Sequence, residues 1–475
     1  MKKLFLMLLG FALAVQGLFA ADTPSPVKYV FLFIGDGLSL PQRMMTEDYR
    51  QIVEGKGVLI NSLETQGFST TFAANQLITD SAASGTAIAC GSKTNVGWLG
   101  LDAQGNRLES VAAVAKKNGR KVGILSSVSL DHATPAAFYA HNASRGNTYD
   151  IALEIFDSGF DLFAGGGFLN ADGKNVADAK GNIFDIAKEK GWVVSRTKEE
   201  FNNLKPTDKP VLAITPRFSD GFSIPYSIDM NDDDLTLADF TAKAIELLDN
   251  DNGFFIMVEG GKIDWMCHAN DAATTIHEVI GFDDAVKVAY DFAQKHPDET
   301  LIVITGDHET GGLTLGFSGT GYQSYLDRLQ HQNISLINFQ PIYRKVKDNK
   351  EASFDDVKPL VTQYFGLKFD GDDNDNMKLT EYEVGKLKEG FKRSRGEGDY
   401  SAAENKSILY GGYDPFLITL LHVLNNKAGI AWTSFAHTAM PVATSAYGKN
   451  AEIFGNMSDN TDISKRLKMM VTKLK

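Results

Sequence analysis

The chain has 475 residues, enough for one large domain or two ordinary ones with ample core. Its 60 acidic residues outnumber its 47 basic residues and give a formal net charge of −13, which argues against binding to nucleic acid or to an anionic membrane. The two cysteines, Cys90 and Cys267, are too few for a disulfide scaffold and lack the Cys-x-x-Cys spacing of a metal site. We expect two separate buried thiols.

Residues 1–20 have the organisation of a secretory signal peptide. Lys2 and Lys3 precede an apolar run over residues 4–15, and Ala20 marks the expected cleavage site. No later stretch reaches the roughly 18 consecutive apolar residues that span a bilayer. The sequence therefore predicts an exported protein, periplasmic or secreted, with no membrane anchor and a mature chain that begins near residue 21.

Five short apolar runs predict buried strands. Each run ends near Gly, Asp or Ser, and amphipathic stretches such as residues 236–248 lie between them. Continuous apolar runs that alternate with helices indicate an α/β fold with a large, mostly parallel central sheet flanked by helices on both faces. The runs are residues 28–34, 122–126, 160–164, 254–258 and 301–305.

Side chains that commonly bind metals follow these predicted strands. Ligands of parallel sheets bind beyond the carboxyl ends of the strands, and these ends meet at one edge of the sheet. We therefore expect the side chains to converge on a shared site. They are Asp36, Thr134, Glu259, Asp307 and His308.

Ser81 lies at the start of a run of small residues, 78–87, that favours a helix. The free N–H groups at the first turn of a helix attract anions, and a serine becomes a nucleophile when a base or a metal activates it. A simple helix cap explains Ser81 and the preceding Asp80 equally well. The nucleophile hypothesis therefore depends on an activator elsewhere in the chain.

Other candidate ligands stand in less specific contexts. Asp264 and His268 are four residues apart, which places both on one face of a helix and suits either two ligands of one ion or an ion pair. His437 lies among apolar residues, where a core histidine is the usual interpretation, and Arg145 is either a surface residue or a clamp for two phosphate oxygens. Mixed imidazole and carboxylate sets suit Zn²⁺, whereas oxygen-only sets suit Mg²⁺.

Residues 318–424 are more polar than the rest of the chain, and this change of composition predicts an inserted, mostly helical subdomain. Within this insertion, residues 372–383 resemble an EF-hand calcium loop, although Met377 stands where glycine would favour the sharp turn. Thr380 and Glu383 also form a capping box for a following helix, so Ca²⁺ binding and a solvated acidic loop both remain open. The candidate calcium ligands are Asp372, Asn374, Asn376, Thr380 and Glu383.

Seven motifs jointly resemble the alkaline phosphatase family. They occur in the family's order between about residues 28 and 448 and are specific as a set, although each is weak alone. They are FIGDG at 33–37, TDSAAS at 79–84, ATPA at 133–136, Ser144-Arg145, EGGKID at 259–264, TGDH at 305–308 and His437-Thr438.

The resemblance implies hydrolysis of small phosphate monoesters through a phosphoserine on Ser81, with two zinc ions and one magnesium. It implies a first zinc held by Asp264, His268 and His437. It implies a second zinc held by Asp36, Asp307 and His308, which also coordinates Ser81. It implies a magnesium held by Asp36, Thr134 and Glu259. Arg145 would clamp the phosphoryl group, and Asp80 would orient Arg145.

The same resemblance implies a homodimer, because in longer members of the family an insertion like residues 318–424 builds a crown over the dimer axis. It also reveals two departures from the enterobacterial type, His132 in place of an aspartate and Trp265 in place of a lysine. Nitrogen is a poorer magnesium ligand, so His132 leaves the third ion open among magnesium, zinc and cobalt. Loss of the lysine is expected to weaken product binding and to speed turnover where release limits the rate.

Two other functions stay open at this point. Related phosphodiesterases usually have a threonine nucleophile and lack the arginine, and sulfatases need a modified Cys or Ser before Pro-x-Arg, a pattern that residues 90–93 do not form. A non-catalytic metal-binding or phosphate-binding protein is disfavoured, because binding alone needs no nucleophile.

Overall fold

The computed structural model describes residues 25–372, 374–397 and 403–472. The predicted signal peptide, residues 1–20, lies outside this part of the chain. No helix within the described ranges combines the length and apolar character needed to cross a membrane.

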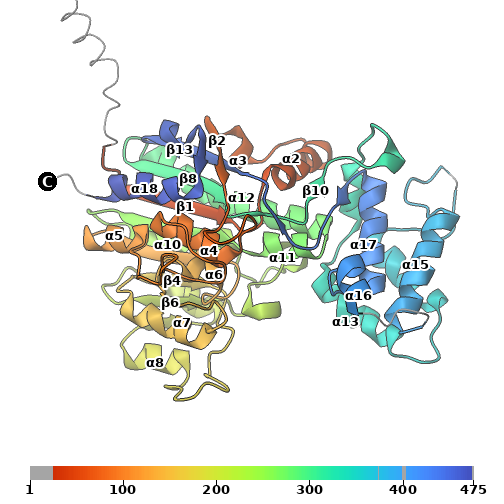
Figure 1. Ribbon diagram of the computed structural model, residues 1–475, viewed down its shortest axis with the longest axis horizontal. Helices are drawn as coiled ribbons and strands as arrows, with labels where there is room; N and C mark the ends of the chain where they lie inside the picture. Colours follow the sequence, from red (N-terminus) through yellow and green to blue (C-terminus); the bar gives the residue numbers. More distant parts are fainter. Residues whose placement is uncertain (1–24, 373, 398–402, 473–475) are drawn as a thin grey trace, which may run out of the picture.

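A ten-stranded sheet forms the centre of the molecule (Figure 1). Its neighbouring strands are parallel, except that β13 runs antiparallel to both β8 and β2. The mostly parallel α/β sheet predicted from the sequence is thus confirmed. In spatial order the strands are β14 (Met457–Asp459), β2 (Thr65–Thr70), β13 (Val442–Gly448), β8 (Thr300–Gly306), β1 (Tyr29–Gly35), β7 (Phe254–Gly260), β3 (Lys121–Ser126), β4 (Leu162–Gly165), β6 (Val211–Ile214) and β5 (Val193–Ser195).

Helices cover both faces of this sheet because the central strands are apolar on both sides. In β1, Val30, Leu32 and Ile34 belong to one hydrophobic core, while Phe31 and Phe33 belong to the core on the opposite face. The first core is closed by α4 (Ser81–Cys90), α5 (Val111–Lys117) and α18 (Asn460–Val471). The second is closed by α10 (Leu237–Leu248) and α12 (Ala272–Lys295).

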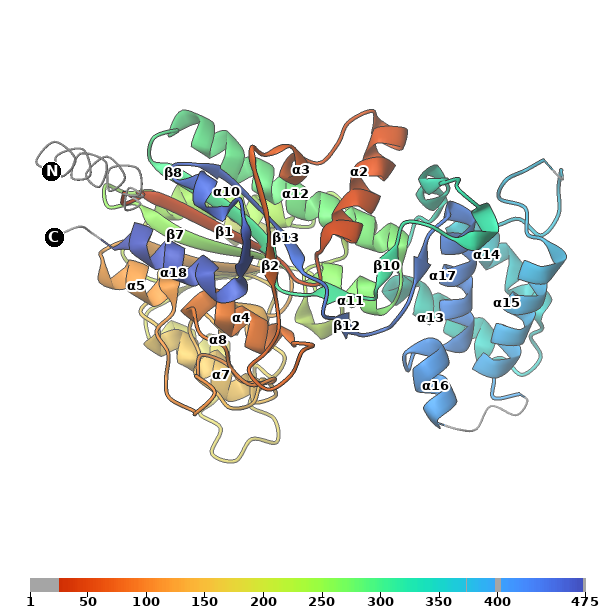
Figure 2. The ribbon, with the colours of Figure 1, turned by 45° about the horizontal axis from the view of Figure 1, so that its top comes forward.

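The predicted insertion, residues 318–424, is mostly helical and stands beside the sheet (Figure 2), and its last helix continues to residue 428. Its helices share a third core, which also includes Met45 of α2 (Leu40–Glu54) and Met266 of α11 (Lys262–His268). The insertion therefore packs against the same elements that flank the metal-type side chains. Its helices are α13 (Leu336–Lys347), α14 (Lys358–Phe365), α15 (Glu381–Ser394), α16 (Ala403–Tyr410) and α17 (Pro415–Ala428).

Three central strands end level with one another. Gly35 of β1 is in register with Gly260 of β7 and with Gly306 of β8. The next residues of β1 and β8 are Asp36 and Asp307, so these two carboxylates start from the same edge. The sequence prediction ended the β7 strand at Val258, but the strand continues to Gly260 and places Glu259 within it. This extension follows from pairing on both sides, with Ile34 of β1 and Ser126 of β3 opposite Glu259.

The end of β8 leaves no room for a side chain. A Cβ added at Gly306 would lie 2.0 Å from the backbone carbonyl oxygen of Leu38. We expect Gly306→Ala to displace the strand end and to lower the free energy of unfolding by about 1–3 kcal/mol, as overpacking does. Urea unfolding measures the change. Gly316→Ala is the control because no atom lies within 4 Å of the added Cβ, and equal stability of the two variants would contradict the prediction.

Candidate active site

Ser81 is the first residue of α4 and is almost fully buried, with 2% of its surface exposed. The helix cap is Asp80, whose side chain accepts a hydrogen bond from the N–H of Ala83 at 3.0 Å. The Ser81 hydroxyl therefore does not serve as the cap. Its Oγ lies 3.2 Å from His308 Nε2 and 3.5 Å from Asp36 Oδ1.

Asp36, Asp307 and His308 form a fully buried cluster beside this hydroxyl. The Nε2 atom of His308 lies 3.3 Å from Asp36 Oδ1 and 3.2 Å from Asp307 Oδ2. Asp307 Oδ1 accepts from the N–H groups of Gly37 and His308, whereas its Oδ2 has no hydrogen-bond partner among the described residues. A buried carboxylate oxygen without a donor is what a bound cation would satisfy.

Asp264, His268 and His437 converge next to that cluster, from α11 and from the short strand β12 (His437–Thr438). His268 Nε2 lies 3.4 Å from Asp264 Oδ2, and His437 Nε2 lies 3.6 Å from Asp264 Oδ1. The other ring nitrogens donate to backbone carbonyls, His268 Nδ1 to Phe435 at 2.6 Å and His437 Nδ1 to Thr79 at 2.8 Å. These bonds leave both Nε2 atoms turned toward the Asp264 carboxylate, the arrangement in which an imidazole can accept a metal ion.

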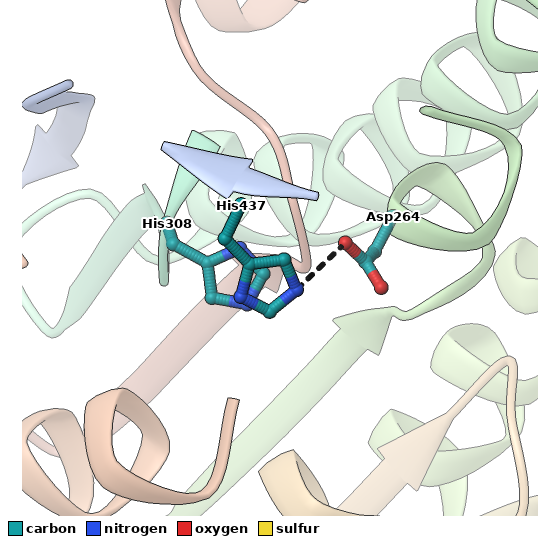
Figure 3. Close-up of side chains that lie close together, drawn as sticks. All are labelled: Asp264, His308 and His437. Carbon is teal, nitrogen blue, oxygen red and sulfur yellow. Dashed lines mark ion pairs between the residues drawn. The ribbon is translucent and has the colours of Figure 1, made fainter. Parts of the chain in front are cut away.

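Figure 3 shows how the two clusters meet. The rings of His308 and His437 are stacked with centroids 3.5 Å apart, and both lie close to Asp264. The two clusters are therefore in contact through the stacked rings of His308 and His437, and Ser81 lies next to His308.

A third group consists of Asp36, Glu259 and His132, with Thr134 alongside. Thr134 Oγ1 donates to Asp36 Oδ2 at 3.4 Å, and Ser126 Oγ donates to Glu259 Oε2. Glu259 Oε1 and His132 Nδ1 have no hydrogen-bond partner in the described structure. Asp36 thus belongs to two groups: its Oδ1 faces His308 of the second group and its Oδ2 faces Thr134 of the third.

Arg145 reaches the mouth of this site from a loop. Its Nη1 donates to Asp80 Oδ2 at 3.0 Å, and its Nη2 lies 3.3 Å from His132 Nε2. Trp265 packs edge-on against His132 with ring centroids 5.8 Å apart. Arg145 thus presents its planar set of N–H groups beside Asp80 and His132, and a guanidinium of this kind can bind an anion.

The electrostatics of the clustered acids favour cations. Burial, followed by the charges of Asp307 and Asp264, holds the pKa of Asp36 well above its usual range. Burial also raises the pKa of Asp307 to about 8 and that of Glu259 to about 7. Burial opposes the ionised pair of Asp264 and His268, but their mutual attraction prevails, lowering the pKa of Asp264 and raising that of His268 to about 9. These ligand types and unpaired oxygens fit divalent ions.

Sequence reasoning missed two polar residues at the site. Ser126, the last residue of β3, holds Glu259, and Thr310 Oγ1 lies between Asp264 Oδ1 at 2.5 Å and His308 Nδ1 at 3.2 Å. Ser126 is the last residue of the predicted strand 122–126, and Thr310 lies five residues after the predicted strand 301–305. The strand-end position that identified the other candidate ligands could therefore have pointed to both.

The candidate calcium ligands lie far along the insertion and are mostly exposed. Glu383, which would be the bidentate ligand of an EF-hand loop, instead caps α15 through Thr380 and pairs with Lys427 Nζ at 3.0 Å. Asp372 accepts from the backbone and side chain of Asn374. Calcium binding stays a prediction, and these contacts favour the capping-box interpretation.

A buried serine beside clustered metal-type ligands, at the carboxyl edge of a parallel sheet, defines the class of metal-dependent hydrolases. A family model described as alkaline phosphatase matches residues 27–473, and the chain belongs to this family. The chain is therefore a phosphoric monoester hydrolase of a metal-dependent family.

Similarity to individual members covers most of the chain. Alkaline phosphatase 3 of Bacillus subtilis is 31% identical over 457 residues, which span 93% of this chain and 88% of the relative. The alkaline phosphatase of Escherichia coli is 31% identical over 341 residues, 60% of this chain and 70% of that protein. The crystal structure of a cold-active alkaline phosphatase from Shewanella sp. is 27% identical with a TM-score of 0.76, and the match covers 94% of this chain and 100% of that one.

The pKa shifts predict how the metal-free protein responds to pH. Asp307, Glu259 and His268 have folded-state pKa values of about 8, 7 and 9, above those of the unfolded chain. Between pH 6.5 and 8 the folded state therefore binds more protons, and stability falls as the pH rises. We expect the free energy of unfolding to fall by about 1–3 kcal/mol over this window, measured by urea unfolding.

Saturating zinc and magnesium provide the control. Bound cations keep the carboxylates ionised in the folded state, so the slope should flatten when both ions are present. A metal-free protein whose stability rises between pH 6.5 and 8 would contradict the assignment of the raised pKa values.

Proposed function

We propose that the enzyme hydrolyses phosphate monoesters through a phosphoserine formed on Ser81. The observation that carries this proposal is the position of Ser81 Oγ, buried between Asp36 and His308 at the start of α4. The hydroxyl would attack phosphorus, lose its proton and displace the alcohol, which takes up a proton as it leaves. Water would then attack the phosphoserine, break the Oγ–P bond and return a proton to Ser81.

We propose that the three groups of ligands hold two zinc ions and one magnesium. Asp264, His268 and His437 would hold the first zinc, and Asp36, Asp307 and His308 the second. Asp36, Thr134 and Glu259 would hold the magnesium. When bound, such ions lower the pKa of a coordinated hydroxyl and neutralise charge on the transferring phosphoryl group.

The protein's own residues would orient the substrate. Asp80 fixes one edge of the Arg145 guanidinium, so that the other N–H groups face the phosphoryl oxygens in a planar fork. The free N–H groups at the start of α4 would add to this anion site. Catalysis of phosphoryl transfer is largely positioning and charge stabilisation, which this arrangement supplies.

We propose that His132 and Trp265 tune the third site and the release of phosphate. His132 lies with Asp36 and Glu259, close enough to offer a nitrogen ligand to the third ion. Magnesium, zinc and cobalt all remain candidates for that ion. Burial, followed by the charge of Arg145, lowers the pKa of His132 to about 3, so the ring is neutral and its nitrogen is available. Trp265 supplies no positive charge to retain the product phosphate.

The Ser81→Ala variant tests the proposed nucleophile. Without the hydroxyl no phosphoserine forms, and we expect the rate on an aryl phosphate to fall by several orders of magnitude, on the order of 10³-fold or more. Ser92→Ala, in the loop after α4, is the matched control and should retain wild-type activity. The same assay with the matching diester and sulfate separates monoesterase activity from the two related activities. Comparable rates on the diester would overturn the substrate assignment.

We further propose that the chain is exported and forms a homodimer, with residues 318–424 as a crown-like subdomain. An apolar hollow of about 420 Å³ lies beside the start of α2, and five large side chains around it are 42–59% exposed. Apolar patches of this kind mark interaction surfaces. The five side chains are Leu40, Phe68, Leu315, Met440 and Met457.

A charge placed in this hollow tests the dimer. We expect Met457→Lys to shift the protein from dimer to monomer in analytical ultracentrifugation, because an unpaired charge would be buried at the interface. Met469→Lys is the matched control, since Met469 is an exposed methionine on α18 outside the hollow. A wild-type protein that sediments as a monomer at micromolar concentration would contradict the proposal.

A further inference from the structure

A buried asparagine lies at the junction between the first ligand cluster and the insertion. Asn270 occupies the turn between α11, which carries Asp264 and His268, and α12. It has a φ of 55° and is 1% exposed. Asparagine tolerates this left-handed conformation better than most residues, and the surrounding contacts must hold it there.

The Asn270 side chain joins three segments of the chain. Its Nδ2 donates to the carbonyl of Cys267 at 2.9 Å, within α11, and to the carbonyl of Ser434 at 3.0 Å, three residues before His437. Both amide hydrogens are used in this way, so Oδ1 is fixed as the acceptor. His422 Nε2 of α17, 2.9 Å from Oδ1, must therefore carry a hydrogen and donate it.

Helix α17 makes one further contact to this turn and one to the segment that carries His437. The Nδ2 of Asn425 donates to the backbone carbonyl of Asn270 at 2.8 Å. The ring of His422 stacks on Phe435 with centroids 5.9 Å apart, and the Phe435 carbonyl accepts the hydrogen bond from His268 Nδ1. Burial lowers the pKa of His422 to about 4, which keeps the ring neutral at pH 7.

These contacts connect the insertion to the spacing of two metal-type ligands. The Nε2 atoms of His268 and His437 are 3.2 Å apart but belong to different segments, α11 and residues 434–438. Asn270 ties the end of the first segment to the second, and His422 ties both to the insertion.

We propose that Asn270 and His422 are positioning residues for the first ligand set, through which α17 fixes the distance between α11 and the segment that carries His437. This inference rests on the proposed zinc role of Asp264, His268 and His437. Groups that orient metal ligands from behind typically account for 10–100-fold in metal affinity. In this interpretation the insertion helps to position the metal ligands, in addition to packing against the edge of the sheet.

Asn270→Gly tests the inference, because glycine adopts the positive φ without strain and removes only the amide. We expect one of the two zinc ions to bind about 10–100-fold more weakly, measured by competition with a chromophoric chelator on the full-length metal-free protein. The isotherm of His437→Ala identifies which binding step belongs to the first set. The other step of Asn270→Gly should stay unchanged.

Variants at His422 separate positioning from packing. His422→Phe keeps an aromatic ring against Phe435 but loses the donor, so it should weaken the same step. His422→Gln keeps an N–H donor and should recover much of the affinity. In the double variant Asn270→Gly/His422→Phe, we expect the two effects to be less than additive, because both variants break one linkage.

Tyr343→Phe is the control for general damage to the insertion, since it removes a buried hydrogen bond of 2.8 Å to Ser394 that is not one of the contacts of Asn270 or His422. It should lower stability without selective loss of zinc. The inference is overturned if Asn270→Gly binds both ions like wild type, or if both steps weaken together as damage to folding would cause. If His437→Ala binds zinc in the same steps as wild type, His437 is not a zinc ligand. That result alone would show that the proposed function has failed, independently of Asn270.

Discussion

The burial of like-charged carboxylates is the constraint on which the rest of this structure depends. Asp36 lies in one ligand group with Asp307 and in another with Glu259, and Asp264 lies in a group with His308; all four acids are at most 4% exposed. Buried acids without counter-charges are costly, and the raised pKa values of the first three express that cost. The sheet and the surrounding helices and loops hold these four carboxylates close together, and bound cations would offset their charge.

The sheet achieves this convergence through the register of its strands. Gly35, Gly260 and Gly306 lie level, and the tight packing of Leu38 over the end of β8 leaves space only for glycine there. Asp36 can therefore offer one oxygen toward His308 and the other toward Thr134. A single carboxylate shared by two groups means that a small displacement of β1 would disturb both.

Much of this site follows from the sequence, because short-range patterns encode it. The strand-end position identified Asp36, Thr134, Asp307 and His308, and helical spacing identified Asp264 with His268. What the sequence leaves hidden depends on contacts between distant residues. Nothing local links Asn270 to His422 and Ser434, which are 152 and 164 residues away. Likewise, the stacking of His308 on His437, which makes the two ligand clusters neighbours, is visible only in three dimensions.

The cluster around His308 and the cluster of Asp264, His268 and His437 differ in how they are supported. Asp36, Asp307 and His308 follow central strands directly, so the sheet itself fixes their positions. His268 and His437 come from a short helix and a two-residue strand, and their ring nitrogens are aimed by the carbonyls of Phe435 and Thr79. Such segments have few ladder hydrogen bonds of their own, so their rigidity must come from outside the sheet. Helix α17 makes its contacts at the turn after α11 and at Phe435, so under the proposed positioning role the helical insertion supplies that rigidity.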